Sequence, residues 1–148
     1  MEPHTTQTLL PRDHKILKTL LHMAQDVAPV ANARLAAAVA IRGDVISFGN
    51  NSLKGHPFQQ RFGKNEFSSY WHAETHAIYN ALKKTTVDAL ERATLYVVRV
   101  KRPHETSREW IVGSSKPCRG CRRCIFDFGI PRVVYGTESE FVCEGVDL

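Results

Sequence analysis

Segments with the periodicity of strands and of helices alternate along this chain, and that alternation favours an α/β layered sheet. The strongest strand pattern is ATLYVVRV at 93–100. Two more strands are expected at 34–41 and 45–48, joined by a tight turn at 42–44, and a further strand at 132–136. Strands that alternate with helices require at least one parallel pair joined by a crossover.

Three helices are expected around these strands. Asp13 can cap the first, whose apolar residues recur at helical spacing until Pro29 stops it. The second runs from about 72 to 84, with alanines, an isoleucine and a leucine on its buried side. The third runs from about 118 to 128 and ends at Gly129.

The 148 residues (1–148) are expected to form a single domain, because the chain can bury a core and has no repeat or low-complexity linker. No apolar run approaches the ~20 residues that span a bilayer, and the N-terminus lacks a signal-peptide pattern. Three of the four cysteines lie within seven positions, too close for a disulfide framework. We therefore expect a cytoplasmic protein without membrane contact, whose thiols bind metal or act in catalysis.

The stretch 50–71 has neither helical nor strand periodicity, so it is expected to be a loop. A loop of this length usually indicates a lid, a binding loop or an interface. The net charge of +5 and the pI near 9.2 permit a nucleic acid or a phosphorylated small molecule as partner. Four basic residues of the loop are expected either to be solvated or to contact phosphate: Lys54, His56, Arg61 and Lys64. Its aromatic residues predict a surface that something buries, and we expect a homo-oligomer: Phe58, Phe62, Phe67, Tyr70 and Trp71.

The stretch WHAETHAIYNAL (71–82) holds polar side chains that an apolar helix face does not need. His72, Glu74 and His76 fall in the first turn and a half of the expected helix. The zincin pattern H-E-x-x-H is not met, because the glutamate stands one position late. We expect His76 to lie in the core or to support a site, with a role as fourth metal ligand as the alternative.

The stretch SSKPCRGCRRC (114–124) places Cys118 and Cys121 three positions apart, directly after Pro117. Proline suits the first turn of a helix, so both thiols are expected on one face of that turn. The free amides and the dipole of a helix start favour ionised thiols. Two adjacent thiolates predict a metal site that needs a further ligand. Cys124 is expected to be a small buried hydrophobe.

His72 can complete that site, since helix N-termini gather at one edge of an open α/β sheet. His72, Cys118 and Cys121 would give zinc three protein ligands and leave a fourth position for water, as in catalytic rather than structural sites. Water bound to zinc has its pKa lowered to about 7. Glu74, two residues from His72, is the right type to shuttle a proton between that water and a leaving group.

These residues carry a family resemblance. His72-Ala73-Glu74 followed by 117–121 resembles the H-x-E…P-C-x-x-C signature of zinc-dependent nucleobase deaminases. Gly49-Asn50-Asn51 is similar to the G-x-N that ends a strand in these enzymes, and FGIPRVVYG is similar to a later helix end and strand. The likeness covers about 35 to 136 and is nearest to small deoxycytidylate-deaminase-like proteins, including phage-encoded ones.

The resemblance implies a fold, a cofactor and a reaction. The fold would be the three-layer α/β/α sandwich of the cytidine-deaminase type, a central mixed sheet with helices on both faces. Zn²⁺ would be held by His72, Cys118 and Cys121, with Glu74 as proton shuttle and with Asn51 and Ala73 among the substrate contacts. We expect hydrolytic deamination of a free cytosine nucleotide, dCMP to dUMP and ammonia, because the basic loop residues could meet one phosphate.

Three alternatives stay open at this point. The base could belong to single-stranded DNA or a transfer RNA, because Arg119, Arg122 and Arg123 lie beside the zinc cysteines. The substrate could also be another free nucleoside or base. The protein could instead be a structural zinc module, closed by Cys124, Cys143 or His76, although that interpretation leaves Glu74 and Asn51 without a role.

Overall fold

The structure is a computed structural model that describes residues 5–30, 32–63, 70–104 and 106–146. Its strands are β1 (Thr5–Gln7), β2 (Arg34–Ile41), β3 (Asp44–Asn50), β4 (Ala93–Lys101), β5 (Ile111–Gly113), β6 (Arg132–Gly136) and β7 (Phe141–Gly145). Its helices are α1 (Pro11–Gln25), α2 (Pro57–Gln60), α3 (Ala73–Leu82), the 3₁₀ helix η1 (Asp88–Arg92) and α4 (Arg119–Asp127).

The described strands form one seven-stranded sheet in the order β1-β7-β6-β4-β2-β3, with β5 paired to the C-terminal end of β4. The β4–β6 pair is parallel and is connected through α4, which confirms the expected crossover. The other neighbouring pairs are antiparallel, so the sheet is mixed.

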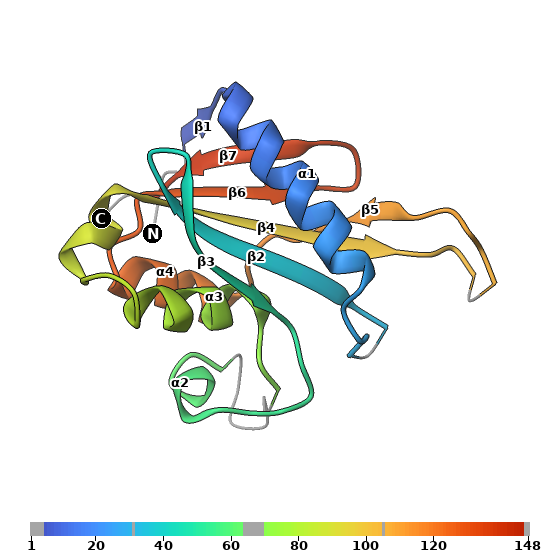
Figure 1. Ribbon diagram of the computed structural model, residues 1–148, viewed down its shortest axis with the longest axis horizontal. Coiled ribbons are helices and arrows are strands. Elements are labelled where there is room, and N and C mark those ends of the chain that lie inside the picture. Colours follow the sequence, from blue (N-terminus) through green and yellow to red (C-terminus); the bar gives the residue numbers. More distant parts are fainter. Residues whose placement is uncertain (1–4, 31, 64–69, 105, 147–148) are drawn as a thin grey trace.

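Helices cover both faces of this sheet (Figure 1). Helix α1 packs on β2 and β4 on one face, whereas α3 and α4 lie on the other. Side chains of β4 alternate accordingly: Leu95 and Val97 join the core beneath α3 and α4, and Tyr96 and Val98 join the core beneath α1. The expected three-layer α/β/α sandwich is confirmed. No helix in the described part of the chain is long and apolar enough to cross a membrane.

One expectation about α1 is wrong. Asp13 is not the N-cap residue of this helix, because the helix begins at Pro11 and Leu10 occupies the N-cap position. Proline has a fixed φ and no N–H, both of which suit the first helical position. Asp13 therefore lies in the third helical position, where its carboxylate accepts a hydrogen bond from the Leu10 N–H at 2.7 Å.

The sequence patterns also missed five short elements, one of which is the 3₁₀ helix η1. β1 and β5 have three residues each, and β7 has one buried residue, Cys143, at its centre. Segments this short carry too little apolar periodicity to be recognised. β1 and β5 pair with the longer strands β7 and β4, and β7 lies between β1 and β6, so pairing within the assembled sheet stabilises all three. Helix α2 lies within the loop 50–71, and Pro57 begins it.

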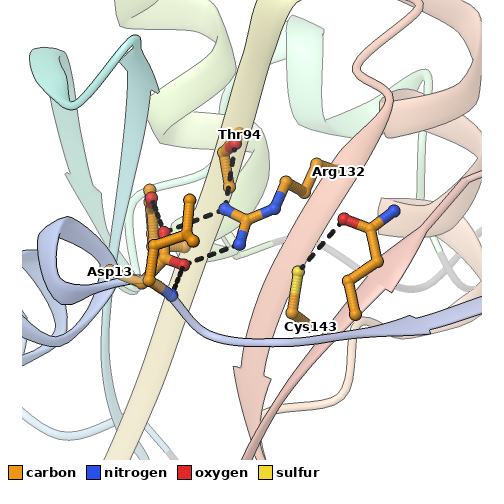
Figure 2. Close-up of polar contacts among 7 residues, drawn as sticks. Asp13, Thr94, Arg132 and Cys143 are labelled. Carbon is orange, nitrogen blue, oxygen red and sulfur yellow. Dashed lines mark hydrogen bonds and ion pairs between the residues drawn. The ribbon is translucent and has the colours of Figure 1, made fainter.

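A buried ionic contact holds α1 against the sheet (Figure 2). Asp13 is fully buried and receives two hydrogen bonds from the Arg132 guanidinium, at 2.9 and 2.6 Å. The Tyr96 hydroxyl also donates to this carboxylate, and Arg132 reaches Thr94 Oγ1 at 3.4 Å. Burial alone would raise the pKa of Asp13, but the hydrogen bonds from Arg132 and from Leu10 outweigh it and lower the pKa to about 2.

This contact predicts acid-dependent stability. The pKa of Asp13 in the folded state, about 2, is below the ordinary value of 3.8. Its stabilising effect is therefore complete above about pH 4 and is lost as the pH falls towards 2. Asp13→Asn should lower the free energy of unfolding at pH 7 by about 3 kcal/mol, because Arg132 loses its buried counter-charge.

The measurement is urea denaturation between pH 2 and 7. Asp26→Asn, an exposed change near the other end of the same helix, is the control and should change stability by no more than about 0.5 kcal/mol. The assignment to Asp13 is wrong if Asp13→Asn leaves the acid dependence in place.

Candidate functional site

Helices α3 and α4 begin beside each other on the same face of the sheet. His72 is the N-cap residue of α3, Cys118 is the N-cap residue of α4, and Cys121 lies in the first turn of α4. His72 Nδ1 is 3.7 Å from Cys118 Sγ and 3.5 Å from Cys121 Sγ. The donor atoms of all three residues lie within 4.8 Å of one another. The three predicted metal ligands thus come together, and we call them the three-ligand cluster.

The cluster fits a tetrahedral zinc ion. With Zn–N and Zn–S distances of about 2.0–2.3 Å, tetrahedral ligands lie roughly 3.5–3.8 Å apart, close to the separations found here. One imidazole nitrogen and two thiolates form a donor set that suits zinc. His72 would coordinate through Nδ1, which faces both sulfur atoms.

The residues considered as a fourth ligand lie elsewhere. Cys124 is buried in the core beneath α3 and α4, and Cys143 belongs to the core on the opposite face of the sheet. His76 Nδ1 accepts a hydrogen bond from the Asn50 N–H at 3.2 Å, and its ring packs on Trp71 at 4.9 Å. Among the described residues the cluster has three members, which fits an open site.

The thiols of the cluster share a hydrogen bond that separates their pKa values. The hydrogen bond from Cys121, helped by His72, lowers the pKa of Cys118 to about 3, although burial opposes this shift. The same contact, together with burial, raises the pKa of Cys121. Burial opposes protonation of His72, but its contact with Cys118 outweighs that effect and raises the imidazole pKa. Cys118 is therefore ready to act as a thiolate ligand.

A cavity of about 310 Å³ opens beside the cluster, and we call it the Glu74 cavity. The described residues that line it are Val30, Ala33, Leu35, Asn51, Tyr70, His72, Ala73, Glu74, Arg99, Ser114, Ser115, Lys116 and Cys118. Glu74 is 4% exposed, and burial raises the pKa of its carboxyl group. A carboxyl group with a raised pKa next to a metal site can accept and return a proton.

Asn51 and Ala73 both line this cavity, as the predicted substrate contacts require. The Asn51 amide is also structural: its oxygen accepts from the Leu35 N–H at 2.9 Å, and its nitrogen donates to the Ala33 carbonyl at 3.0 Å. One N–H of the amide and one lone pair of its oxygen remain for other partners. Asn51 therefore joins the end of β3 to the start of β2 at the wall of the cavity.

The basic loop residues have other neighbours. The ring of His56 stacks on Trp71 at 4.6 Å, and its Nδ1 accepts from the Phe58 N–H at the start of α2. Arg61 lies over the rings of Phe58 and Phe62, at 5.5 and 5.1 Å. These two residues and the exposed Lys54 are not among the described lining residues of the Glu74 cavity, and Lys64 lies outside the described residues.

The loop aromatics are largely buried within the chain itself. Phe58, Phe62 and Trp71 are at most 7% exposed and belong to the core beneath α3 and α4. Tyr70 is 38% exposed and stacks on His72 at 4.8 Å, and Phe67 lies outside the described residues. These side chains therefore do not require a second copy of the chain, and the homo-oligomer stays a prediction.

A buried glutamine positions the start of α3, and the sequence patterns gave it no role. Gln59 of α2 is 1% exposed, and its side-chain oxygen accepts a hydrogen bond from the His72 N–H at 2.9 Å. The same oxygen accepts from the Thr75 hydroxyl. Because the first amides of a helix lack partners within the helix, Gln59 caps α3 from a separate segment. The sequence offered only a weak indication that Gln59 is buried, namely that it follows Phe58 in a loop with several apolar residues.

Two cations of the cavity were also missed. Arg99 follows Leu95 and Val97 on the face of β4 that is turned towards α3 and α4, and this charge at an inward position was the available signal. Lys116 stands in the connection that leads to Cys118, where no periodicity distinguishes it.

Comparisons with known proteins agree with this geometry. Residues 11–137 match the family described as the cytidine and deoxycytidylate deaminase zinc-binding region. The structure is similar to that of a cytidine deaminase from Burkholderia pseudomallei, with a TM-score of 0.61 and 18% identity over 89% of this chain and 91% of that one. It is also similar to a dCMP deaminase from the cyanophage S-TIM5 in complex with dCMP and dUMP, with a TM-score of 0.50 and 19% identity over 85% and 82% of the two chains. Among curated proteins, none matches this sequence.

The cluster predicts one zinc per chain. Cys118→Ala or Cys121→Ala should abolish zinc retention, because two remaining protein ligands hold the ion poorly. Cys124→Ala and Cys143→Ala are matched controls, since both remove a buried thiol outside the cluster. The measurement is metal content after dialysis against a weak chelator. Loss of zinc from either control would instead indicate a closed, structural site.

Gln59→Ala should weaken zinc binding by about 10- to 100-fold, because His72 loses the contact that fixes its backbone. The adjacent Gln60→Ala, an exposed change in the same helix, should bind zinc as the wild type does. Both dissociation constants can be measured by competition with a chromogenic chelator. Equal affinity in the two variants would remove Gln59 from the support of the site.

Proposed function

Because this chain belongs to the cytidine and deoxycytidylate deaminase family and is a zinc-dependent deaminase, we propose that it converts free dCMP to dUMP and ammonia. The observation that carries the proposal is the Glu74 cavity, where a buried carboxyl group, the three-ligand cluster and two cations line one space. Its volume of about 310 Å³ lies at the lower end of the range of small-molecule sites.

The residues of the cavity have separate roles in this proposal. Zinc, when bound by His72, Cys118 and Cys121, supplies Lewis-acid activation of a water molecule. Glu74 would carry both protons of the attacking water, the first to the ring nitrogen N3 and the second to the departing amino group, so that oxygen replaces the amino group on the ring carbon and ammonia leaves. The net reaction consumes one water per nucleotide. Asn51 and Ala73 are proposed to orient the sugar or base against the wall of the cavity.

Two features favour a nucleotide over a nucleoside as substrate: the positive charge of the cavity and the ligands of a similar solved structure. Arg99 and Lys116 line the Glu74 cavity, and a phosphate is the natural partner of two cations in a small site. The similar cyanophage enzyme is described in complex with dCMP and dUMP, and we extend that substrate class to this chain.

A second candidate is deamination of a base in single-stranded nucleic acid. A neighbouring cavity of about 700 Å³ shares Arg99 and is basic, with Pro29, Asn32, Arg34, Lys101, Arg102, Pro103 and His104 as its other described lining residues. Strand binding would need an aromatic ring open for stacking. Trp110 is already approached by the guanidinium groups of Arg34 and Arg102, at 5.2 and 4.9 Å, and Tyr70, the exposed ring that lines the Glu74 cavity, is stacked on His72 at 4.8 Å. The free nucleotide is therefore the better candidate.

Ammonia release over a substrate panel tests the proposal. The zinc-loaded protein should deaminate dCMP faster than deoxycytidine, and should not act on single-stranded DNA or on a transfer RNA. Deamination of an oligonucleotide with dCMP untouched, together with binding that weakens steeply with salt, would establish the second candidate instead.

Glu74→Gln is the control within the same panel. It should retain zinc and bind dCMP, and it should lose at least about 10³-fold in kcat, because both proton transfers lose their carrier. Substantial ammonia release by folded, zinc-loaded Glu74→Gln protein would remove this glutamate from the mechanism.

A further inference from the structure

We propose that Arg99 and Lys116 bind the phosphate group of the substrate and make the enzyme select a nucleotide over a nucleoside. This assignment rests on the proposed function and deepens it. The phosphate would then be bound by residues at the end of β4 and in the connection before α4. The sequence had instead suggested basic residues of the loop 50–71 for this contact.

Arg99 occupies a position where a charge needs a partner. It is the residue after Leu95 and Val97 in the row of β4 side chains beneath α3 and α4, and it lies at the C-terminal end of the strand. Its Nε atom is buried and has no hydrogen-bond partner among the described residues. Burying a guanidinium nitrogen without a partner is costly, so an anionic ligand in this cavity would relieve the penalty.

Gly113 lets the Arg99 side chain lie along the sheet. Gly113 of β5 is the direct pairing partner of Arg99, and a Cβ atom there would stand 3.3 Å from Arg99 Cδ. Any larger residue would push against the arginine stem. The short strand β5 therefore leaves room for Arg99 beside the cavity, where its donors form a fork that suits phosphate oxygens.

Lys116 projects from a backbone segment that is fixed on both sides. Ser115 Oγ donates to the Val97 carbonyl at 2.8 Å and accepts from the Gly136 N–H at 2.8 Å. The Ser115 N–H also donates to the Gly136 carbonyl at 2.9 Å. Ser114 and Lys116 flank this anchor, and both line the Glu74 cavity, two positions or more before Cys118. Lys116, whose side chain is exposed, thus lines the cavity from a fixed stretch of backbone.

The balance of charge in the cavity supports the same assignment. Glu74 is the one carboxylate among its described lining residues, and it lies beside the three-ligand cluster. Neither Arg99 nor Lys116 forms an ion pair with a described carboxylate. In contrast, Arg61 of the loop packs on two aromatic rings outside the cavity. Two cations without internal partners in one small space are what a phosphate group requires.

The test is the ratio of kcat/KM for dCMP to that for deoxycytidine. Arg99→Gln and Lys116→Ala should each lower kcat/KM for dCMP by about 10- to 100-fold, mainly through KM, and change that for deoxycytidine by no more than about twofold. Arg99→Lys should recover part of the loss, because it keeps the charge without the fork. Lys84→Ala, which removes an exposed charge just after α3, is the matched control and should leave the ratio unchanged.

Inorganic phosphate gives a second readout without turnover of the base. It should inhibit the wild type competitively against dCMP, and the inhibition should weaken about tenfold in Lys116→Ala. Zinc content and thermal stability of each variant should equal those of the wild type.

The outcomes separate this inference from the proposed function. If the wild type prefers dCMP and both variants keep that preference, the phosphate assignment alone is overturned. If the variants lose activity equally on dCMP and deoxycytidine, the two residues act on the fold or on the base, and the assignment is also overturned. If the wild type acts on neither nucleotide nor nucleoside, the proposed function itself fails.

Discussion

The contact between α3 and the edge strand β3 sets the position of His72 and Glu74, the functional groups at the start of α3. Helix and strand touch backbone to backbone, because a Cβ atom at Gly49 would stand 2.6 Å from the Ala73 carbonyl oxygen and closer still to the Ala77 nitrogen. Ser47 Oγ donates to the Ala77 carbonyl at 2.7 Å, and the Asn80 amide donates to the Phe48 carbonyl at 2.8 Å. These contacts fix the distance between α3 and the sheet.

The segment between Ser52 and Trp71, which precedes α3, contacts both α3 and α4. Its two ends meet in a bridge between Ser52 and Trp71, and Gln59 caps α3 from within it. A Cβ atom at Gly120 of α4 would stand 2.8 Å from the Phe62 carbonyl carbon, so the first turn of α4 lies directly on the same segment. The loop that the sequence suggested as a lid or interface therefore supports both helix starts, and the three-ligand cluster depends on it.

The two faces of the sheet carry different polar groups for different purposes. On the α1 face, Asp13 and Arg132 neutralise each other, and the Tyr96 hydroxyl completes the contact. On the α3 and α4 face, Glu74 has a hydrogen bond from Cys121, whereas Arg99 forms no ion pair with a described carboxylate, and both line a cavity. Breaking the paired contact on the α1 face would destabilise the fold, whereas the cation on the other face can still take an anionic partner.

The sequence by itself determined the layered fold and the two motifs that supply the metal ligands, because periodicity and motif spacing are local, whereas the meeting of His72 with the two cysteines depended on strand order. Helical and strand periodicities predicted the longer elements, and two motifs at helix starts predicted His72, Glu74, Cys118 and Cys121. Tertiary structure alone decided what surrounds them. Gln59, Arg99 and Lys116 reach the site from separate segments, and such contacts depend on strand order and packing, which no local pattern encodes. For the same reason His56 and Arg61, two of the basic loop residues, pack on aromatic rings in the fold.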